Sequence, residues 1–349
     1  MNWLKDNFHF VFGDFARAFL SVLFEGVPFL LLGSIISGLV DVFVSSERVT
    51  KMLPRKPGPA IFMAGLLGLI FPMCECGSVI IVRRFIRKGV PVAVAMTYML
   101  AAPIVSPIVA ISTFMAFSGQ QPWMMVSLRL GFGFLIAVVF GLIIHQLPQR
   151  RILQDGLTPD DQPKRRTGLS ISGAPEDAPD FAQMVAAASP LRRLLLAVQS
   201  ATADFLDVAF YFVIGVAITS VFAVGINQEA LSPLAEGQPL LSVITLMVMA
   251  ALLALCSTTD AFVAATQFVP FSAASKLAFL LFGPVFDLKL FWLYGLVFKR
   301  RFVIVLSIAL FVLIALICWI WGGLDTGSKA REAAQSLGSI GCLLFNTRL

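Results

Sequence analysis

Charged residues are scarce in this chain. Of its 349 residues, 13% are Asp, Glu, Lys or Arg and 58% are hydrophobic, whereas soluble domains carry about 25% charged residues. This composition excludes an ordinary soluble domain and predicts an all-α polytopic membrane protein. The net charge of +6 is typical of basic loops that face anionic lipid. Because no basic stripe with interleaved aromatic residues is present, we expect no nucleic-acid partner.

Histidines and nucleotide-binding motifs are also few or missing. The two histidines, His9 and His145, are too few for a histidine metal site and disfavour a Ser-His-Asp triad. No GxxxxGK[ST] loop is present to cradle ATP phosphates. The longest polar segment is too short and too rich in proline to form an enzyme domain. The sequence therefore predicts no enzyme and no bound cofactor.

The apolar runs are interrupted at Phe71-Pro72-Met73-Cys74-Glu75-Cys76-Gly77. Proline and glycine are both poor residues for a helix interior. A helix that is broken at membrane depth leaves backbone groups unpaired, so it is tolerated only where it lines a cavity or is buried in protein. Two thiols and a carboxylate at such a break indicate a binding site.

The same pattern returns in the second half of the chain. An offset of 182 residues superimposes three pairs of similar residues: Glu25 and Asp207, Gly33 and Gly215, Cys74 and Cys256. An offset shorter by one residue superimposes two further pairs: Pro103 and Pro284, Ser106 and Asp287. Because acid, glycine, cysteine and proline match in order, we interpret the chain as an internal duplication of roughly 125 residues.

This duplication divides the chain into four segments. We expect an N-terminal transmembrane repeat at 1–147, a polar proline-rich cytoplasmic linker at 148–196, a C-terminal transmembrane repeat at 197–322 and a weakly ordered tail at 323–349. The amphipathic residues 1–15 are expected at the membrane interface.

Basic loops distinguish two arrangements of the apolar segments. If all eight apolar runs crossed the membrane, the basic loops at 45–57 and 83–89 would lie on opposite sides, contrary to the positive-inside rule. If the two cysteine-bearing runs turn back at their breaks, both loops and the linker lie in the cytoplasm, and the acidic loop at 226–238 lies outside. The two halves then have opposite orientations. We expect this inverted repeat, with broken or re-entrant helices meeting at a central site. Eight plain transmembrane helices in a parallel repeat are the alternative.

The cysteines at the breaks suit a soft solute. Thiolates bind thiophilic ions such as Cu(I) and Zn(II), and by the same logic trivalent arsenic. Cys74, Cys76 and Cys256 come together if the two breaks face each other, and they are the predicted ligands of a transported ion. Burial as small apolar residues is the alternative interpretation, and we favour it for Cys318 and Cys342. The remaining candidates for substrate binding are Glu75, Ser257, Thr258, Thr259, Pro103, Ser106 and Pro107.

Ionisable groups at membrane depth are costly, so each needs a function or a partner. The candidates for proton coupling are Glu75, Asp260, Asp287, Glu25, Asp207 and Lys289. Burial favours the neutral form of a carboxylic acid, which suits reversible protonation. An interfacial cap is the alternative for Glu25 and Asp207. Lys289 either pairs with Asp287 or extends to the interface, and Arg129 is either an internal counter-ion or extends in the same way.

Four motifs carry a likeness to a known family: Pro72-Met73-Cys74-Glu75-Cys76-Gly77, Ala101-Ala102-Pro103-Ile104-Val105-Ser106-Pro107, Cys256-Ser257-Thr258-Thr259-Asp260-Ala261-Phe262 and Leu281-Phe282-Gly283-Pro284-Val285-Phe286-Asp287-Leu288-Lys289. Over residues 15–322 the chain resembles the ArsP-type permease family, including its YraQ-type predicted permeases. Many members have an acidic residue where this chain has Thr258. The resemblance implies a multi-pass permease of the bacterial inner membrane. Some members export trivalent organoarsenicals, relatives are linked to metal efflux, and many have no known substrate.

The residues and the resemblance together predict a secondary transporter. It would export a thiophilic solute by alternating access, coupled to protons. Its expected partners are the lipid bilayer and the solute, with a second copy of the chain or an accessory membrane protein as further candidates. A permease for another small solute with structural cysteines is one alternative. A membrane thiol-redox protein, in which Cys74 and Cys76 react, is another, and a structural subunit that needs another protein is a third.

Overall fold

The computed structural model describes residues 12–43, 54, 56–70, 73–154, 190–225 and 239–346. These residues form helices and turns, with one isolated bridge. Most of the amphipathic N-terminus, most of the linker and the acidic loop at 226–238 lie outside the described residues. Four helices are long and apolar enough to cross a membrane: α2 (Phe12–Phe43), α8 (Pro122–His145), α11 (Pro190–Gly225) and α17 (Arg300–Asn346).

Between these long helices lie four pairs of short helices, each pair separated by a break. In the first half the pairs are α4 (Pro57–Ile70) with α5 (Glu75–Arg87), and α6 (Val92–Ala101) with α7 (Pro107–Ala116). In the second half they are α13 (Pro239–Leu253) with α14 (Thr259–Thr266), and α15 (Ala273–Phe282) with α16 (Leu288–Tyr294). Each half is therefore a long helix, two broken pairs and a long helix. The one addition, α9 (Gln149–Ile152), follows the first half.

The first cysteine-bearing pair turns back on itself. Gly141, near the end of α8, lies against Ile61 early in α4, and Gly68 lies against the break between α6 and α7. Helix α4 therefore runs from the end of α8 toward the centre. Helix α5 then runs back from the centre toward the end of the bundle where α11 begins. Arg84, near the end of α5, donates to Ser200 Oγ, near the start of α11, at 2.9 Å. This hairpin has the geometry that the expected re-entrant arrangement requires.

The second cysteine-bearing pair forms the inverted counterpart. Ala250, late in α13, lies against Gly283 in the break between α15 and α16. Helix α14 then runs away from the centre, since the carbonyl of Ala265 near its end accepts a bond from Gln120 Nε2 at 3.4 Å. Gln120 precedes the start of α8, so this hairpin opens toward the other end of the bundle. The two halves therefore have opposite orientations.

One end of the bundle, which we call the basic end, carries most of the cationic residues. Here α5, α8 and α16 end and α17 begins, with Arg83, Arg84, Arg87, Arg150, Arg151, Lys299 and Arg300. The backbone of Lys299 donates to Ile152 at 2.9 Å, beside a bridge between Leu153 and Phe298. We expect this end in the cytoplasm.

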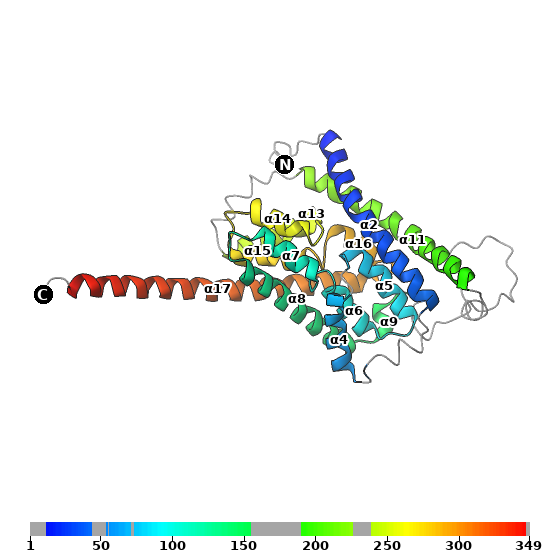
Figure 1. Cartoon of the computed structure of the whole chain (residues 1–349), viewed down its shortest axis with the longest axis horizontal. Coiled ribbons are helices and arrows are strands. Elements are labelled where there is room, and N and C mark those ends of the chain that lie inside the picture. The colour runs from blue at the N-terminus through cyan, green and yellow to red at the C-terminus, as the bar shows by residue number, and fades with distance from the viewer. Residues whose placement is uncertain are drawn as a thin grey trace.

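The packing of the short helices follows the internal repeat. Helix α4 packs on α6 as α13 packs on α15, and α5 packs on α16 as α7 packs on α14. The long helices α2 and α11 break this symmetry. They pair with each other and lie on α5 and α16, the side near the basic end. In Figure 1 they cross one side of the bundle, with α5 and α16 beside them.

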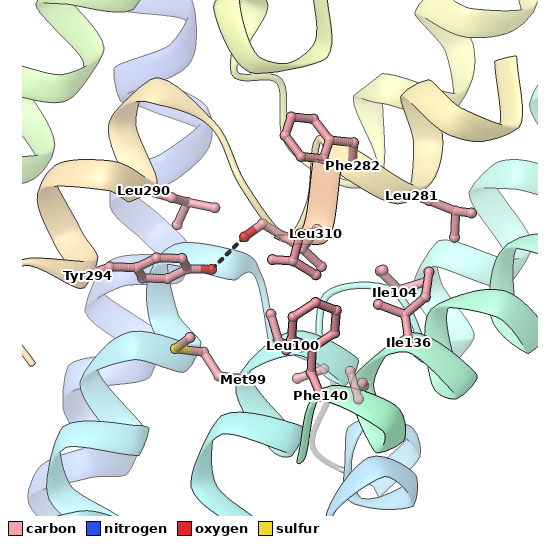
Figure 2. Packing of buried hydrophobic residues seen from close by; sticks show 14 of the residues in the cluster. Met99, Leu100, Ile104, Ile136, Phe140, Leu281, Phe282, Leu290, Tyr294 and Leu310 are labelled. Atoms are coloured by element: carbon pink, nitrogen blue, oxygen red, sulfur yellow. Dashed lines mark hydrogen bonds between the residues drawn. The ribbon is translucent and has the colours of Figure 1, made fainter. Parts of the chain in front are cut away.

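The core joins both halves near the breaks. Figure 2 shows Leu100 and Phe140 of the first half close to Leu310 of the second. The hydroxyl of Tyr294 donates to the carbonyl of Val285, at 2.7 Å, in the last break. This bond satisfies a backbone group that the broken helix leaves unpaired.

Two helices extend beyond the segments expected for them. The backbone of α17 is helical to Asn346, where we expected a weakly ordered tail from 323. The segment contains Lys329-Ala330-Arg331-Glu332-Ala333-Ala334, which are strong helix formers. Helix α11 begins at Pro190, inside the predicted linker, because proline fits the first turn of a helix.

Candidate functional site

The first break ends with a cysteine that caps a helix. Cys74 has an extended backbone, and its Sγ accepts a bond from the backbone N–H of Gly77 at 3.4 Å. Cys76 lies two residues further on, in the first turn of α5. Cys74, Glu75 and Cys76 are all buried, with exposed fractions of 7%, 2% and 2%. The break therefore turns both thiols and the carboxylate inward.

Lys289 connects three of the four breaks. Its Nζ atom lies 3.0 Å from Glu75 Oε1 in the first half and 3.3 Å from Asp287 Oδ2 in its own break. The same atom donates to the carbonyl of Ala254 at 2.8 Å. Ala254 lies in the α13–α14 break and has a positive φ of 45°, a conformation that costs energy for a residue with a Cβ. One ammonium thus supports two carboxylates and a strained backbone carbonyl.

The charges of this cluster do not balance. Glu75, Asp287 and Lys289 are each at most 2% exposed. Two carboxylates face one ammonium, so the group carries a net negative charge unless one carboxylate holds a proton. Glu75 Oε2 is buried and has no hydrogen-bond partner among the described residues. This oxygen is suited to hold a proton or to contact a solute.

A small cavity lies beside this cluster. It is lined by residues of both halves: Val22, Glu25, Gly26, Phe29, Cys74, Glu75, Cys76, Phe212, Cys256 and Lys289. Its volume is about 10 Å³, which is near the minimum for a single water molecule. The three break cysteines therefore line one cavity, but the cavity is closed to a larger solute in this conformation.

Helices α2 and α11 close the cavity. A Cβ added at Gly26 would lie 2.3 Å from Phe212 Cζ, so the ring of α11 sits directly on the glycine of α2. Gly33 also lies close to the backbone of Gly77 on α5, where an added Cβ would be 2.9 Å from its Cα. Small residues at these crossings allow the close approach of membrane helices.

A second polar cluster lies at the α13–α14 break. Arg129, fully buried in α8, donates to both carboxylate oxygens of Asp260, at 2.9 and 2.7 Å. It also donates to the carbonyl of Ser257 at 2.9 Å and to Thr113 Oγ1 at 2.8 Å. Arg129 is therefore an internal counter-ion. A link between the long helices and this break is formed by Thr259, whose hydroxyl donates to Glu25.

The remaining predicted residues are placed apart from the cavity. Asp207 is exposed and pairs with Arg83 at 3.2 Å, toward the basic end. Pro103 and Ser106 are buried in the α6–α7 break, and Pro107 begins α7. Ser257 contributes its carbonyl to Arg129, and Thr258 is the half-buried N-cap of α14. None of these lines the central cavity.

The cavity is not a preformed metal site. Among the residues the structure describes, no three His, Cys, Asp or Glu side chains are grouped to hold a metal ion. Binding of a soft ion by Cys74, Cys76 and Cys256 would therefore require the thiols to move together.

Sequence reasoning missed two polar groups. Asp204 of α11 accepts bonds from Arg84 and from Ser37, the latter at 2.8 Å. Lys276 of α15 donates to Gln120 Oε1 at 3.0 Å. Each of the two residues is a charge inside an apolar run, and this pattern indicates a paired or functional group. The pattern does not show which residue forms the pair.

Two known proteins are similar in sequence to this chain over most of its length. The chain is 32% identical over 298 residues to UPF0718 protein YcgR of Bacillus subtilis (strain 168), covering 85% of this chain and 92% of that protein. It is 30% identical over 286 residues to a putative two-component membrane permease complex subunit of Streptococcus mutans serotype c, covering 82% and 87%. No solved structure matches the chain.

The family comparison covers nearly the whole membrane region. Residues 11–323 match the model of a family described as predicted permease, of the ArsP type. The match spans both halves of the repeat and all four breaks. The chain is therefore a multi-pass membrane protein that belongs to the ArsP-type predicted permease family.

Proposed function

We propose that this permease is a secondary transporter that exports a thiophilic solute, such as a trivalent organoarsenical or a soft metal ion, in exchange for protons. The observation that carries the proposal is the cavity in which three thiols from both halves lie beside Glu75 and Lys289. A general solute carrier does not need thiols from two separate helix breaks at one place. The family assignment supports transport, and the thiols support the choice of solute.

Thiol chemistry gives the binding step. A trivalent organoarsenical with two hydroxyl groups on arsenic reacts with two thiols, forming two As–S bonds and releasing two water molecules. Arsenic keeps its oxidation state, so no oxidant is needed. Cys74, Cys76 and Cys256 line one cavity. Reversal of the reaction by two waters releases the solute on the other side.

The buried carboxylates supply the proton coupling in this proposal. Glu75 and Asp287 share one ammonium, so one bound proton makes the cluster neutral and its burial less costly. Asp260 is already paired with Arg129 and acts as a structural partner of the second break. Glu25, hydrogen-bonded to Thr259, is a further proton carrier at the cavity wall. Asp207 is less suited to this role because it is exposed.

The asymmetric packing of the long helices supports alternating access. Helices α2 and α11 lie on α5 and α16. The internal repeat relates α5 to α14 and α16 to α7, so the equivalent arrangement places α2 on α7 and α11 on α14. Movement of the α2–α11 pair between these two sides would open the cavity first to one end and then to the other.

An accessory membrane protein is part of the proposal. The Streptococcus mutans relative is described as a subunit of a two-component membrane permease complex. We infer that this chain also acts with a second membrane component or with another copy of itself. Reconstitution of the purified chain alone, compared with everted native membranes, tests this point. Flux in membranes without flux after reconstitution would support the requirement for a partner.

Uptake into everted membrane vesicles tests the function. Trivalent methylarsenite is the first solute, with Cu(I) and Zn(II) for comparison, each measured with and without a proton gradient. Wild type is compared with Cys74→Ser, Cys76→Ser and Cys256→Ser. The matched control is Cys318→Ser, which alters a buried cysteine that does not line the cavity. We expect gradient-dependent uptake that the three cavity variants lose and the control keeps.

Two outcomes would contradict the proposal. Uptake of none of the three solutes, or uptake that is equal in all variants, would favour a different solute and structural cysteines. Formation of a disulfide among these cysteines during turnover, measured by mass spectrometry, would favour the thiol-redox alternative. The first outcome leaves the permease assignment intact, whereas the second would replace it.

A further inference from the structure

A second cavity lies at the end of the bundle opposite the basic end. It has a volume of about 220 Å³, room for several water-sized groups. The side chains around it come from the end of α7, the start of α8 and the start of α15: Phe117, Gln120, Gln121, Met124, Met125, Ala273 and Lys276. None of these residues belongs to the central thiol cavity.

The cationic group of this cavity is Lys276. The residue is 5% exposed and lies near the start of α15, between Ser275 and Leu277. Its Nζ atom donates to Gln120 Oε1 at 3.0 Å, which is a neutral partner. In the described part of the chain, Lys276 forms no ion pair, whereas the buried cations Arg129 and Lys289 each face a carboxylate. A buried charge without a counter-ion is unstable, so this ammonium requires a negative partner.

The backbone around the cavity adds to the positive potential. Helices α8 and α15 both begin here, and their N-terminal residues line it. Free N–H groups and the helix dipole favour an anion at such ends. The Gln121 N-cap of α8 has a left-handed backbone with φ of 55° and no side-chain cap bond. A left-handed backbone at a residue other than glycine costs energy, and such residues are often found at binding sites.

We propose that this cavity binds a small anion with oxygen acceptors, such as a carboxylate or a tetrahedral oxyanion. Lys276 supplies the charge, and the amide N–H groups of Gln120 and Gln121 supply further donors. The site lies outside the thiol cavity and does not depend on the proposed solute. Gln120 Nε2 also donates to the carbonyl of Ala265 on α14 at 3.4 Å. Anion binding therefore stabilises the contact between the first half and the second re-entrant hairpin.

The anion has two chemical sources, a free solute or the phosphate of a lipid headgroup. Trp123, next to the cavity lining, is 72% exposed, and exposed tryptophans are enriched at the membrane–water interface. Lipid headgroups therefore lie at the same depth as the cavity. The two sources share the same recognition chemistry, so the experiment must separate them.

Thermal unfolding of the purified full chain in a phosphate-free, non-ionic detergent tests the proposal. Inorganic phosphate and acetate are titrated at constant ionic strength, and in a second arm phosphatidylglycerol is compared with phosphatidylcholine. We expect saturable stabilisation of wild type by phosphate, acetate or phosphatidylglycerol. The apparent affinity should fall at least about tenfold in Lys276→Met, because one charge-assisted partner is removed. Lys56→Met, which removes an exposed lysine, is the matched control and should bind as wild type does.

The same variants separate a ligand site from a structural lysine. Without any anion, Lys276→Met should be at least as stable as wild type, because it removes a buried charge that has no carboxylate partner among the described residues. Stabilisation by phosphatidylglycerol alone would assign the site to lipid, and stabilisation by phosphate or acetate would assign it to a free solute. Lack of stabilisation by all three, or an equal response of Lys276→Met and wild type, would overturn the proposal.

Discussion

The Nζ atom of Lys289 lies 3.0 Å from Oε1 of Glu75, although the two residues are 214 positions apart and belong to opposite halves of the repeat. This contact fixes the start of α16 against the start of α5. It also leaves Asp287 as a second carboxylate on the same ammonium. The cluster therefore contains one more acid than base, and single substitutions should have very unequal effects.

Removal of Lys289 should be far more damaging than removal of Glu75. Lys289→Met leaves two buried carboxylates without a cation, and breaking a buried ion pair costs about 3–5 kcal/mol. Glu75→Gln leaves one carboxylate and one ammonium, which remain balanced, so folding should be nearly preserved. Thermal unfolding in detergent measures both effects. Equal losses in the two variants would show that charge balance does not govern this cluster.

Glu75→Gln should also change the response to the proton gradient. The variant removes the carboxylate whose second oxygen has no hydrogen-bond partner in the described residues. If this group carries the proton, uptake into everted vesicles should become independent of the gradient while solute binding to the thiols persists. Asp207→Asn, at an exposed site, is the control. A gradient dependence that survives in Glu75→Gln would assign coupling to another carboxylate.

Arg129 and Asp260 should behave as one energetic unit. Arg129→Met leaves a buried carboxylate, and Asp260→Asn leaves a buried guanidinium, so each should cost about 3–5 kcal/mol. The double variant removes both charges and should be more stable than the sum of the single losses predicts. A double-mutant cycle on unfolding temperatures measures the difference, with coupling of about 0.5–3 kcal/mol expected for residues in contact. Additive losses would mean that the pair does not interact in solution.

The positions of the breaks could be predicted from the sequence because their causes are local. Proline or glycine occurs in or beside three of the four breaks, and the offset of 182 residues, which maps Cys74 onto Cys256, predicts the fourth. The re-entrant turns followed from the basic residues at 83–89, which α5 carries back to the basic end. These signals need no knowledge of packing.

The partners of the buried charges could not be predicted in the same way. Membrane helices such as α2 and α11 are apolar on all sides, so their sequence does not mark the face that packs. The pairing of Lys289 with Asp287 was one of two interpretations of its sequence position, whereas its contact with Glu75 depends on how the two halves meet. Arg129 had two interpretations for the same reason. The asymmetric position of α2 and α11 arises from tertiary contacts alone.

Gly26 and Phe212 should control the size of the thiol cavity. Gly26→Ala places a Cβ 2.3 Å from the Phe212 ring, and such overpacking costs about 1–3 kcal/mol. Phe212→Ala removes the ring and enlarges the cavity, so Gly26→Ala should cost less stability in the Phe212→Ala background than in wild type. Unfolding temperatures of the single and double variants measure this difference. An equal cost of Gly26→Ala in both backgrounds would show that the ring does not set the distance between the two helices.

Gly33 should hold α2 against α5 in the present conformation. In Gly33→Val the side chain meets the backbone of Gly77, because even a Cβ would lie 2.9 Å from its Cα. A strain of about 1–3 kcal/mol shifts the equilibrium between two conformations roughly 5–150-fold. In Gly33→Val, α2 should therefore spend more time away from α5. Cys76, adjacent to Gly77, should then react faster with an impermeant maleimide added from the basic end. The rate is measured in a background of Cys74→Ala, Cys256→Ala, Cys318→Ala and Cys342→Ala, so that Cys76 is the remaining one of the five cysteines.

Gly131→Val provides the control for this measurement, since a Cβ at Gly131 meets no neighbour and the glycine lies on α8, away from α2. Its labelling rate should match that of wild type. Faster labelling in Gly33→Val alone would connect the α2–α5 contact to access from the basic end, as alternating access requires. If labelling is unchanged, or faster from the opposite end, then the α2–α11 pair does not close the cavity on the side that we propose.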